Sequence, residues 1–202
     1  MSTLHSPREA SGSLLDRRHF LGAGLAALAL PARAGDGDAE DAIRAGGVVV
    51  ALRHALAPGT YDPADFRLGD CGTQRNLSEE GRAQARRIGE WFAARLLKPA
   101  RIRSSPWCRC VDTATLAFGS ADTWAALGSP RGADEAMNAG HLHDLRGSLA
   151  SASAVPGRFE VWVTHMFVLS ALAALNTGSG EGLVLQSNAA GLPQVIARLS
   201  IG

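Results

Sequence analysis

Apolar residues along the chain fall into short runs separated by amphipathic segments. The run at 48–52 is continuous and rich in β-branched residues, which predicts a strand buried on both faces of a sheet. After Ser78, a typical N-cap residue, the apolar positions 85, 88, 92 and 96 recur at helical spacing and predict a buried helix face. Further strands are predicted at 101–105, 122–126, 159–164, 183–186 and 194–199, and further helices at 107–118, 142–153 and 166–175.

This alternation of strands and helices predicts a three-layer α/β/α sandwich with a mainly parallel central sheet. The segment 35–47 is small and charged, and we expect it to be an irregular lead-in. The loop at 57–76 is longer than most connections and rich in Pro, Gly and Asp. Loops of this length tend to carry function, so residues within it are candidates for the site.

The N-terminal segment has the pattern of an export signal. Arg17 and Arg18 precede a short apolar run, 20–30, and a small-residue site that ends at Ala34. The adjacent arginines and the mild Gly/Ala hydrophobicity are typical of a twin-arginine signal. We therefore expect residues 1–34 to be recognised by the twin-arginine export machinery and cleaved near Ala34. Residues 35–202 would then form a single periplasmic domain with no stable membrane span after processing.

Composition and charge exclude some classes of protein. With 202 residues, 46% of them apolar and 19% charged, the chain is typical of a globular domain. Its formal net charge is only +1. A chain this close to neutral lacks the positive surface that non-specific nucleic-acid binding requires, so we expect no nucleic-acid partner.

Basic and imidazole side chains follow three of the predicted strands where each strand ends: Arg53 and His54, then Arg109, then His165. Ligands of open α/β sheets bind beyond the carboxyl ends of the strands, so these side chains are expected to share one crevice. Guanidinium groups match phosphate oxygens in pairs, and a neutral imidazole can attack phosphorus. The pattern therefore indicates a site for a phosphoryl group.

Four segments carry a family resemblance. They are Arg53-His54-Ala55 after the first strand, Asn-Leu-Ser-Glu-Glu-Gly-Arg-Ala-Gln-Ala at 76–85, Ser-Ser-Pro-Trp-Cys-Arg-Cys-Val-Asp-Thr-Ala at 104–114, and Val-Thr-His at 163–165. In this order they resemble motifs of the histidine phosphatase (phosphoglycerate mutase-like) superfamily, and the chain looks like a small exported member of branch 1.

The resemblance implies an activity and roles for four residues. His54 would be the nucleophile that takes the phosphoryl group, while Arg53, Arg109 and His165 would neutralise the charge on its oxygens. The chain would then hydrolyse phosphomonoesters or phosphohistidine, with a phosphorylated small molecule or surface polymer as substrate. No metal and no cofactor is implied, because the arginines supply the positive charge.

The sequence departs from the family pattern at three points. Ala55 stands where glycine is usual, and the stretch between 118 and 159 is too short for a large substrate-binding insert. The residue that protonates the leaving group has no motif of its own, which leaves Asp122, Glu135 and Asp144 as candidates. The short insert favours a small, open phosphatase over a mutase.

The long loop supplies weaker candidates for substrate contact, namely Tyr61, Gln74 and Arg75. Three cysteines also lie in this part of the chain: Cys71, Cys108 and Cys110. In an oxidising compartment Cys71 can pair with Cys108 or with Cys110, and the alternative is three buried thiols.

Two other functions remain open from the sequence. His141, His143 and Asp144 can be interpreted as ligands of a metal-dependent hydrolase, although their spacing is not a specific metal signature. The chain can also be interpreted as a periplasmic protein that binds a phosphate ligand without turnover, since the proton donor is not identified.

Overall fold

The computed structural model describes residues 36–130 and 133–201. All of them belong to one compact unit of the chain. The predicted export signal, residues 1–34, lies outside the described residues. No helix in the described part of the chain combines the length and the apolar character needed to cross a bilayer.

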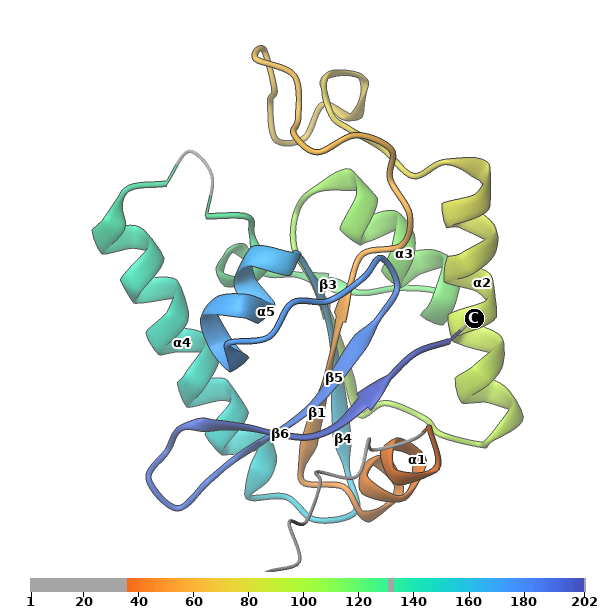
Figure 1. Cartoon of the computed structure of the whole chain (residues 1–202), viewed down its shortest axis with the longest axis vertical. Helices are drawn as coiled ribbons and strands as arrows, with labels where there is room; N and C mark the ends of the chain where they lie inside the picture. The colour runs from red at the N-terminus through yellow and green to blue at the C-terminus, as the bar shows by residue number, and fades with distance from the viewer. Residues whose placement is uncertain (1–35, 131–132, 202) are drawn as a thin grey trace, which may run out of the picture. The chain divides into compact units, whose positions relative to one another are not determined.

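The described chain forms a six-stranded sheet with helices on both faces (Figure 1). The strands are β1 (Val48–Arg53), β2 (Arg101–Ser104), β3 (Asp122–Thr123), β4 (Phe159–Thr164), β5 (Gly182–Ser187) and β6 (Pro193–Leu199). The α-helices are α1 (Asp36–Ala45), α2 (Glu79–Ala94), α3 (Cys108–Phe118), α4 (Glu135–Ser153) and α5 (Met166–Ala173). Two short 3₁₀ turns, η1 (Cys71–Thr73) and η2 (Ala125–Leu127), complete the fold.

The strand order is β3-β2-β4-β1-β5-β6. Strands β1 to β4 run parallel to one another, whereas β5 is antiparallel to β1 and β6 is antiparallel to β5. The predicted fold class, an α/β sandwich with a mainly parallel sheet, is confirmed. The carboxyl ends of β1, β2 and β4 consequently meet at one edge of the sheet.

Strand β1 is buried on both faces, as its continuous apolar run predicts. Val48, Val50 and Leu52 pack into one core layer, in which α1, α2 and α3 cover the sheet. Val49 and Ala51 point to the opposite face and pack with α4 and α5. This period-two alternation places a helical layer on each side, which makes the domain a three-layer sandwich.

Helix α2 begins as its sequence predicts and ends earlier. The Ser78 hydroxyl accepts a hydrogen bond from the Gly81 N–H at 3.0 Å, and Ile88 and Phe92 are buried. Leu96, predicted to continue the buried face, instead follows the end of the helix with a positive φ of 56° and is 89% exposed. The chain has turned toward β2 at this point, so position 96 no longer lies on the helix face.

The other differences concern boundaries in weakly patterned segments. The expected lead-in at 35–47 contains helix α1, whose Ala39 and Ile43 are buried one turn apart. Helix α4 starts seven residues before the predicted boundary, because the Asp134 carboxylate caps it by accepting the Met137 N–H at 2.7 Å. Strand β3 is limited to two residues because η2 follows it at once.

Candidate active site

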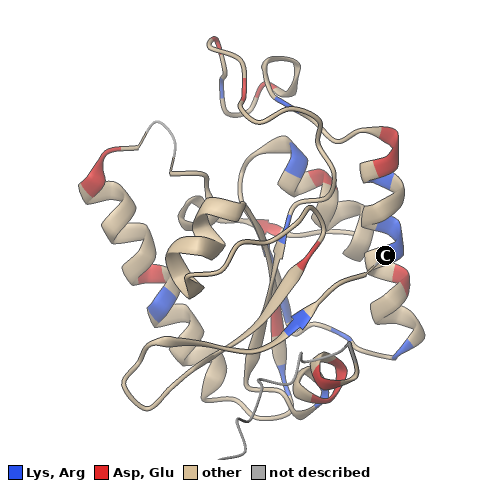
Figure 2. Cartoon of the chain, in the orientation of Figure 1, with Lys and Arg blue, Asp and Glu red and all other residues tan. Residues whose placement is uncertain are grey.

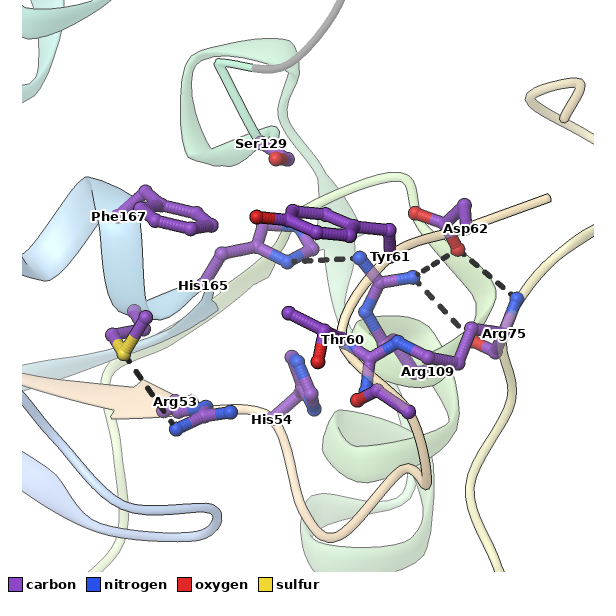
Figure 3. Close-up of a pocket in the computed structure, with 12 residues that line it drawn as sticks. Arg53, His54, Thr60, Tyr61, Asp62, Arg75, Arg109, Ser129, His165 and Phe167 are labelled. Atoms are coloured by element: carbon purple, nitrogen blue, oxygen red, sulfur yellow. Dashed lines mark hydrogen bonds and ion pairs between the residues drawn. The ribbon is translucent and has the colours of Figure 1, made fainter. Parts of the chain in front are cut away.

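The edge of the sheet brings the two predicted histidines together. His54 directly follows β1 and His165 directly follows β4, and these strands are parallel neighbours with Arg53 opposite Thr164. The two imidazole rings lie 5.6 Å apart between centroids. Arg109 reaches the same place from the first turn of α3. The convergence expected from the strand ends is therefore what the structure shows (Figure 3).

Backbone contacts hold His54 in place. Its own N–H donates to the carbonyl oxygen of Thr164 on β4 at 2.9 Å. The next residue, Ala55, donates its N–H to the Thr113 hydroxyl on α3 at 3.0 Å. Leu56 donates its N–H to the Gln84 side chain on α2, also at 3.0 Å. Three elements thus fix the chain on either side of the imidazole.

The first turn of α2 lies directly against this segment. A Cβ added at Gly81 would come within 2.0 Å of the Leu56 carbonyl oxygen, so only glycine permits this approach. The Ser78 N–H donates to the same carbonyl at 3.1 Å. Gly81, the glycine of the 76–85 motif, therefore lets α2 pack against the backbone beside His54 and support it.

The imidazole of His54 has a defined tautomer. Nδ1 lies 2.7 Å from the carbonyl oxygen of Ala55, which can only accept, so Nδ1 carries the proton and Nε2 keeps its lone pair. Burial lowers the pKa of His54 to about 3, with the charges of Arg109, Arg75 and Arg53 acting in the same direction. The ring is consequently neutral and nucleophilic at any ordinary pH.

His165 is also held as a neutral ring. Its Nδ1 accepts a long hydrogen bond of 3.4 Å from the Arg109 guanidinium, so Nε2 carries the proton and donates to the Ser105 hydroxyl at 2.8 Å. Burial lowers its pKa well below the ordinary value, and Arg109 lowers it further. Ser105, from the Ser-Ser-Pro segment, therefore orients the second histidine.

Three guanidinium groups face the pocket: Arg53, Arg75 and Arg109. Their Nε atoms are buried and have no hydrogen-bond partner among the described residues, which is uncommon for charged groups. On α2, by contrast, basic and acidic positions are interspersed (Figure 2). The pocket therefore concentrates positive charge, with three arginines and one acidic residue in its lining.

Asp62 is the one carboxyl group among the described residues that line the pocket. Its Oδ1 accepts from Arg109 Nη1 at 2.7 Å and from the Arg75 N–H at 3.0 Å. Burial alone would raise the pKa of Asp62, but these hydrogen bonds and the charges of Arg109 and Arg75 lower it below its ordinary value. The carboxylate is thus ionised and ties the long loop to α3.

The sequence did not single out Asp62, and its candidates for the proton donor do not reach the pocket. Asp122, Glu135 and Asp144 are all exposed on β3 or α4, and none lines the pocket. Asp122 instead pairs with Arg101 at 3.6 Å. The structure therefore does not bring these three candidates to the histidines, whereas Asp62, in the long loop before α2, lies in the pocket.

Of the three weaker candidates on the long loop, two line the pocket and one does not. Arg75 and Tyr61 line the pocket, as expected from their position. Gln74 does not: its Oε1 accepts the Cys108 N–H at 2.9 Å and its Nε2 donates to the Arg67 carbonyl at 3.0 Å. Gln74 therefore holds the loop, and it does not line the pocket. Thr60, Ser129, Met166 and Phe167 complete the lining beyond the predicted set.

The cysteines resolve one of the open alternatives. Cys71 and Cys108 form a disulfide, which joins η1 in the long loop to the first residue of α3, directly before Arg109. Cys110 is a buried free thiol whose Sγ lies 3.6 Å from His165 Nε2, and burial raises its pKa to about 12. The disulfide therefore anchors the loop that carries Asp62 and Arg75, while Cys110 stays protonated.

The metal interpretation of the 141–144 segment receives no support from the fold. His143 and Asp144 are exposed on α4, and His141 is half-buried and does not line the pocket of His54. The described ranges contain no group of three or more His, Cys, Asp or Glu side chains arranged to hold a metal ion. These residues do not form the ligand cluster that a metal-dependent hydrolase needs.

Comparisons with known proteins agree with this geometry. Residues 50–128 match the model of the histidine phosphatase superfamily (branch 1). A comparison with curated proteins found no match.

Among solved structures, the protein histidine phosphatase SixA with tungstate is 18% identical with a TM-score of 0.51, covering 76% of this chain and 96% of that one. A mycobacterial glucosyl-3-phosphoglycerate phosphatase with vanadate is 20% identical with a TM-score of 0.54, and the match covers 76% of this chain and 99% of that one. A phosphoserine phosphatase variant from Entamoeba histolytica with phosphoserine is 12% identical with a TM-score of 0.52, and the match covers 76% of this chain and 97% of that one. Residues 50–128, which include His54 and Arg109, thus match the histidine phosphatase superfamily, branch 1, within a domain that has the fold of these solved phosphatases.

Proposed function

We propose that this protein is a phosphatase that hydrolyses phosphomonoesters, or phosphohistidine, through a covalent phosphohistidine at His54. The observation that carries the proposal is the state of His54: its Nδ1 proton is donated to the Ala55 carbonyl, its pKa is lowered to about 3, and three guanidinium groups surround it. A neutral Nε2 beside a phosphate-binding cluster is the arrangement that nucleophilic attack on phosphorus requires.

The proposed reaction proceeds in two displacements. Arg53, Arg75 and Arg109 bind the phosphoryl oxygens, and Nε2 of His54 attacks phosphorus while the bond to the ester oxygen breaks. The alcohol leaves with a proton. Water then attacks the phosphohistidine, the P–N bond breaks, and inorganic phosphate leaves as the neutral imidazole is restored. The positive charge that stabilises both transition states comes from side chains, so no metal or cofactor is needed.

Asp62 is our candidate for the proton donor to the alcohol. In the free pocket its carboxylate is ionised because Arg109 holds it. A phosphoryl dianion that takes up the donors of Arg109 weakens this ion pair and brings a second negative charge near the carboxylate. Both effects raise the pKa of Asp62, so the carboxyl group can carry a proton when substrate is bound.

The test uses the full chain with p-nitrophenyl phosphate in the presence of EDTA. We expect phosphate release that His54→Ala reduces at least about 1,000-fold, since the nucleophile is lost. His143→Ala, a histidine exposed on α4, is the matched control and should keep its activity. Rapid quenching should trap an acid-labile, alkali-stable phosphoprotein in the wild type and in His143→Ala, and none in His54→Ala.

The alternatives give different results. Tight vanadate binding without any phosphate release would favour a protein that binds a phosphate ligand without turnover. Activity that EDTA removes and His54→Ala retains would refute the proposal and restore a metal-dependent mechanism.

We further propose that the chain is exported through the twin-arginine route to the periplasm, where a phosphorylated small molecule or surface polymer would be its substrate. The Cys71–Cys108 disulfide supports this, because structural disulfides persist in oxidising compartments. Replacing Arg17 and Arg18 with Lys should retain the protein in the cytoplasmic fraction. Periplasmic recovery of this variant would contradict the route.

A further inference from the structure

An apolar hollow lies beside the phosphoryl pocket. It encloses about 410 Å³, against about 130 Å³ for the pocket itself, and the two share Ser129 in their linings. Its walls include Phe66, Leu68 and Met137. Ser129 and His141 are the polar side chains of the described lining, which contains no Asp, Glu, Lys or Arg. A mainly apolar hollow therefore adjoins the positively charged pocket.

Trp107 connects the hollow to the reacting groups. This residue occupies the N-cap position of α3, directly before the helix, and it lines the hollow. It meets the His165 ring edge-on, with centroids 5.2 Å apart, and stacks on Phe66 at 5.4 Å. Only the His165 side chain thus separates the apolar wall from the phosphoryl site. The alcohol part of a bound ester has to lie in this position, next to the phosphoryl group.

Exposed apolar side chains gather at the same place. Eight large hydrophobic residues of the described chain are exposed, and four of them line the pocket or the hollow: Tyr61, Leu68, Met137 and Phe167. Figure 3 shows Tyr61 and Phe167 on the same side of the pocket as Ser129. Exposed apolar side chains around a concave site mark a ligand-binding surface.

We infer that the alcohol part of the substrate is apolar, so that the protein acts on phosphomonoesters of aryl or alkyl alcohols in preference to those of sugars, glycerol or hydroxy acids. The inference rests on the proposed phosphatase function and specifies its substrate class. An apolar alcohol buries its surface against Leu68, Trp107 and Met137. A polyhydroxylated one loses hydrogen bonds to water there and meets mainly apolar side chains, since only Ser129 and His141 are polar in the described lining.

The first experiment compares two esters of primary alcohols, 2-phenylethyl phosphate and glycerol 3-phosphate, with the full chain. Their leaving groups differ little in intrinsic reactivity, so the comparison reports on binding of the alcohol. We expect kcat/KM to favour the phenylethyl ester roughly 30-fold, equivalent to about 2 kcal/mol. Equal values for the two esters would overturn the inference while leaving phosphatase activity established.

Paired variants assign the preference to the hollow. Leu68→Ser and Met137→Ser combined should reduce the preference to about threefold, because the apolar contact is lost. Leu192→Ser is the matched control: Leu192 is 53% exposed, Leu68 is 52% exposed, and Leu192 lies in the β5–β6 turn at the opposite end of the sheet. A preference that persists in the double variant, or that falls equally in the control, would contradict the role of the hollow.

A binding measurement separates this inference from the proposed function. Calorimetry with 3-phenylpropylphosphonate and 2,3-dihydroxypropylphosphonate, which cannot be hydrolysed, should show tighter binding of the phenyl compound even if no ester is turned over. Selective binding without turnover would refute the phosphatase function and keep the apolar subsite. Turnover with equal phosphonate affinities would refute the subsite alone.

Discussion

At the scale of single residues, the pocket depends on how Arg109 divides its donors. One nitrogen contacts the Asp62 carboxylate at 2.7 Å and the other contacts His165 at 3.4 Å, with both side chains of the ion pair almost fully buried. An anionic substrate has to compete with Asp62 for this guanidinium. The carboxylate therefore weakens binding of the phosphoryl group while it supplies the group that can protonate the alcohol.

We expect Asp62→Asn to separate these two effects. Removing the charge should tighten vanadate binding, because Arg109 no longer has an anionic partner. The kcat for an alkyl ester should fall about 100-fold, the usual size of a general-acid contribution, whereas p-nitrophenyl phosphate should be much less affected. Asp144→Asn is the matched control on exposed α4. An equal loss for both esters would show that Asp62 positions Arg109 and donates no proton.

At the scale of elements, the sequence predicts those parts of the site that sit on strongly patterned strands. Apolar runs locate β1 and β4, and the basic residue after each run is placed at the sheet edge by the parallel arrangement. Asp62 lacks such a signal, since it belongs to a loop without periodicity and reaches the pocket only through long-range contacts. The sequence does not predict helix α1 for a related reason. Only Ala39 and Ile43 are buried hydrophobic residues in this helix, and many of the others are charged, so the apolar pattern is weak.

The long loop itself should depend on its disulfide. Cys71→Ser opens a link across 37 residues and should lower the free energy of unfolding by about 3 kcal/mol in denaturant titrations. It should also raise KM, because Asp62 and Arg75 are no longer fixed against α3. A thiol reductant should reproduce both effects in the wild type and leave Cys71→Ser unchanged. Unaltered kinetics in the reduced wild type would show that the loop holds its position without the disulfide.

At the scale of the whole molecule, the buried histidines should make stability depend on pH. The pKa of His54 falls from 6.5 to about 3 on folding, so between these values the unfolded chain binds more protons than the folded one. Stability is fully present above pH 6.5 and decreases as the pH falls toward 3. His54 alone accounts for a loss of about 2 kcal/mol at pH 5, and the lowered pKa values of His165 and Asp62 act in the same direction.

Chemical denaturation at pH 7.5 and pH 5 measures this loss, and His54→Asn should reduce it by about 2 kcal/mol. His54, the proposed nucleophile, stays neutral over this range, so kcat should show no acid limb with a pKa near 6.5. A stability difference that is the same in wild type and His54→Asn would contradict the assignment to His54.

The position of β4 between β1 and β2 governs the order in which the molecule can assemble. Both flanking strands leave the ribosome before β4 does, yet neither hydrogen-bonds to the other in the finished sheet. His54 and Arg109 are thus synthesised early and are brought to their final separation only when β4 inserts and adds His165. A nascent chain that stops short of β4 holds His54, the proposed nucleophile, without a formed pocket. The proposed competence for phosphoryl transfer would therefore arise late, in a folding step that joins distant parts of the chain.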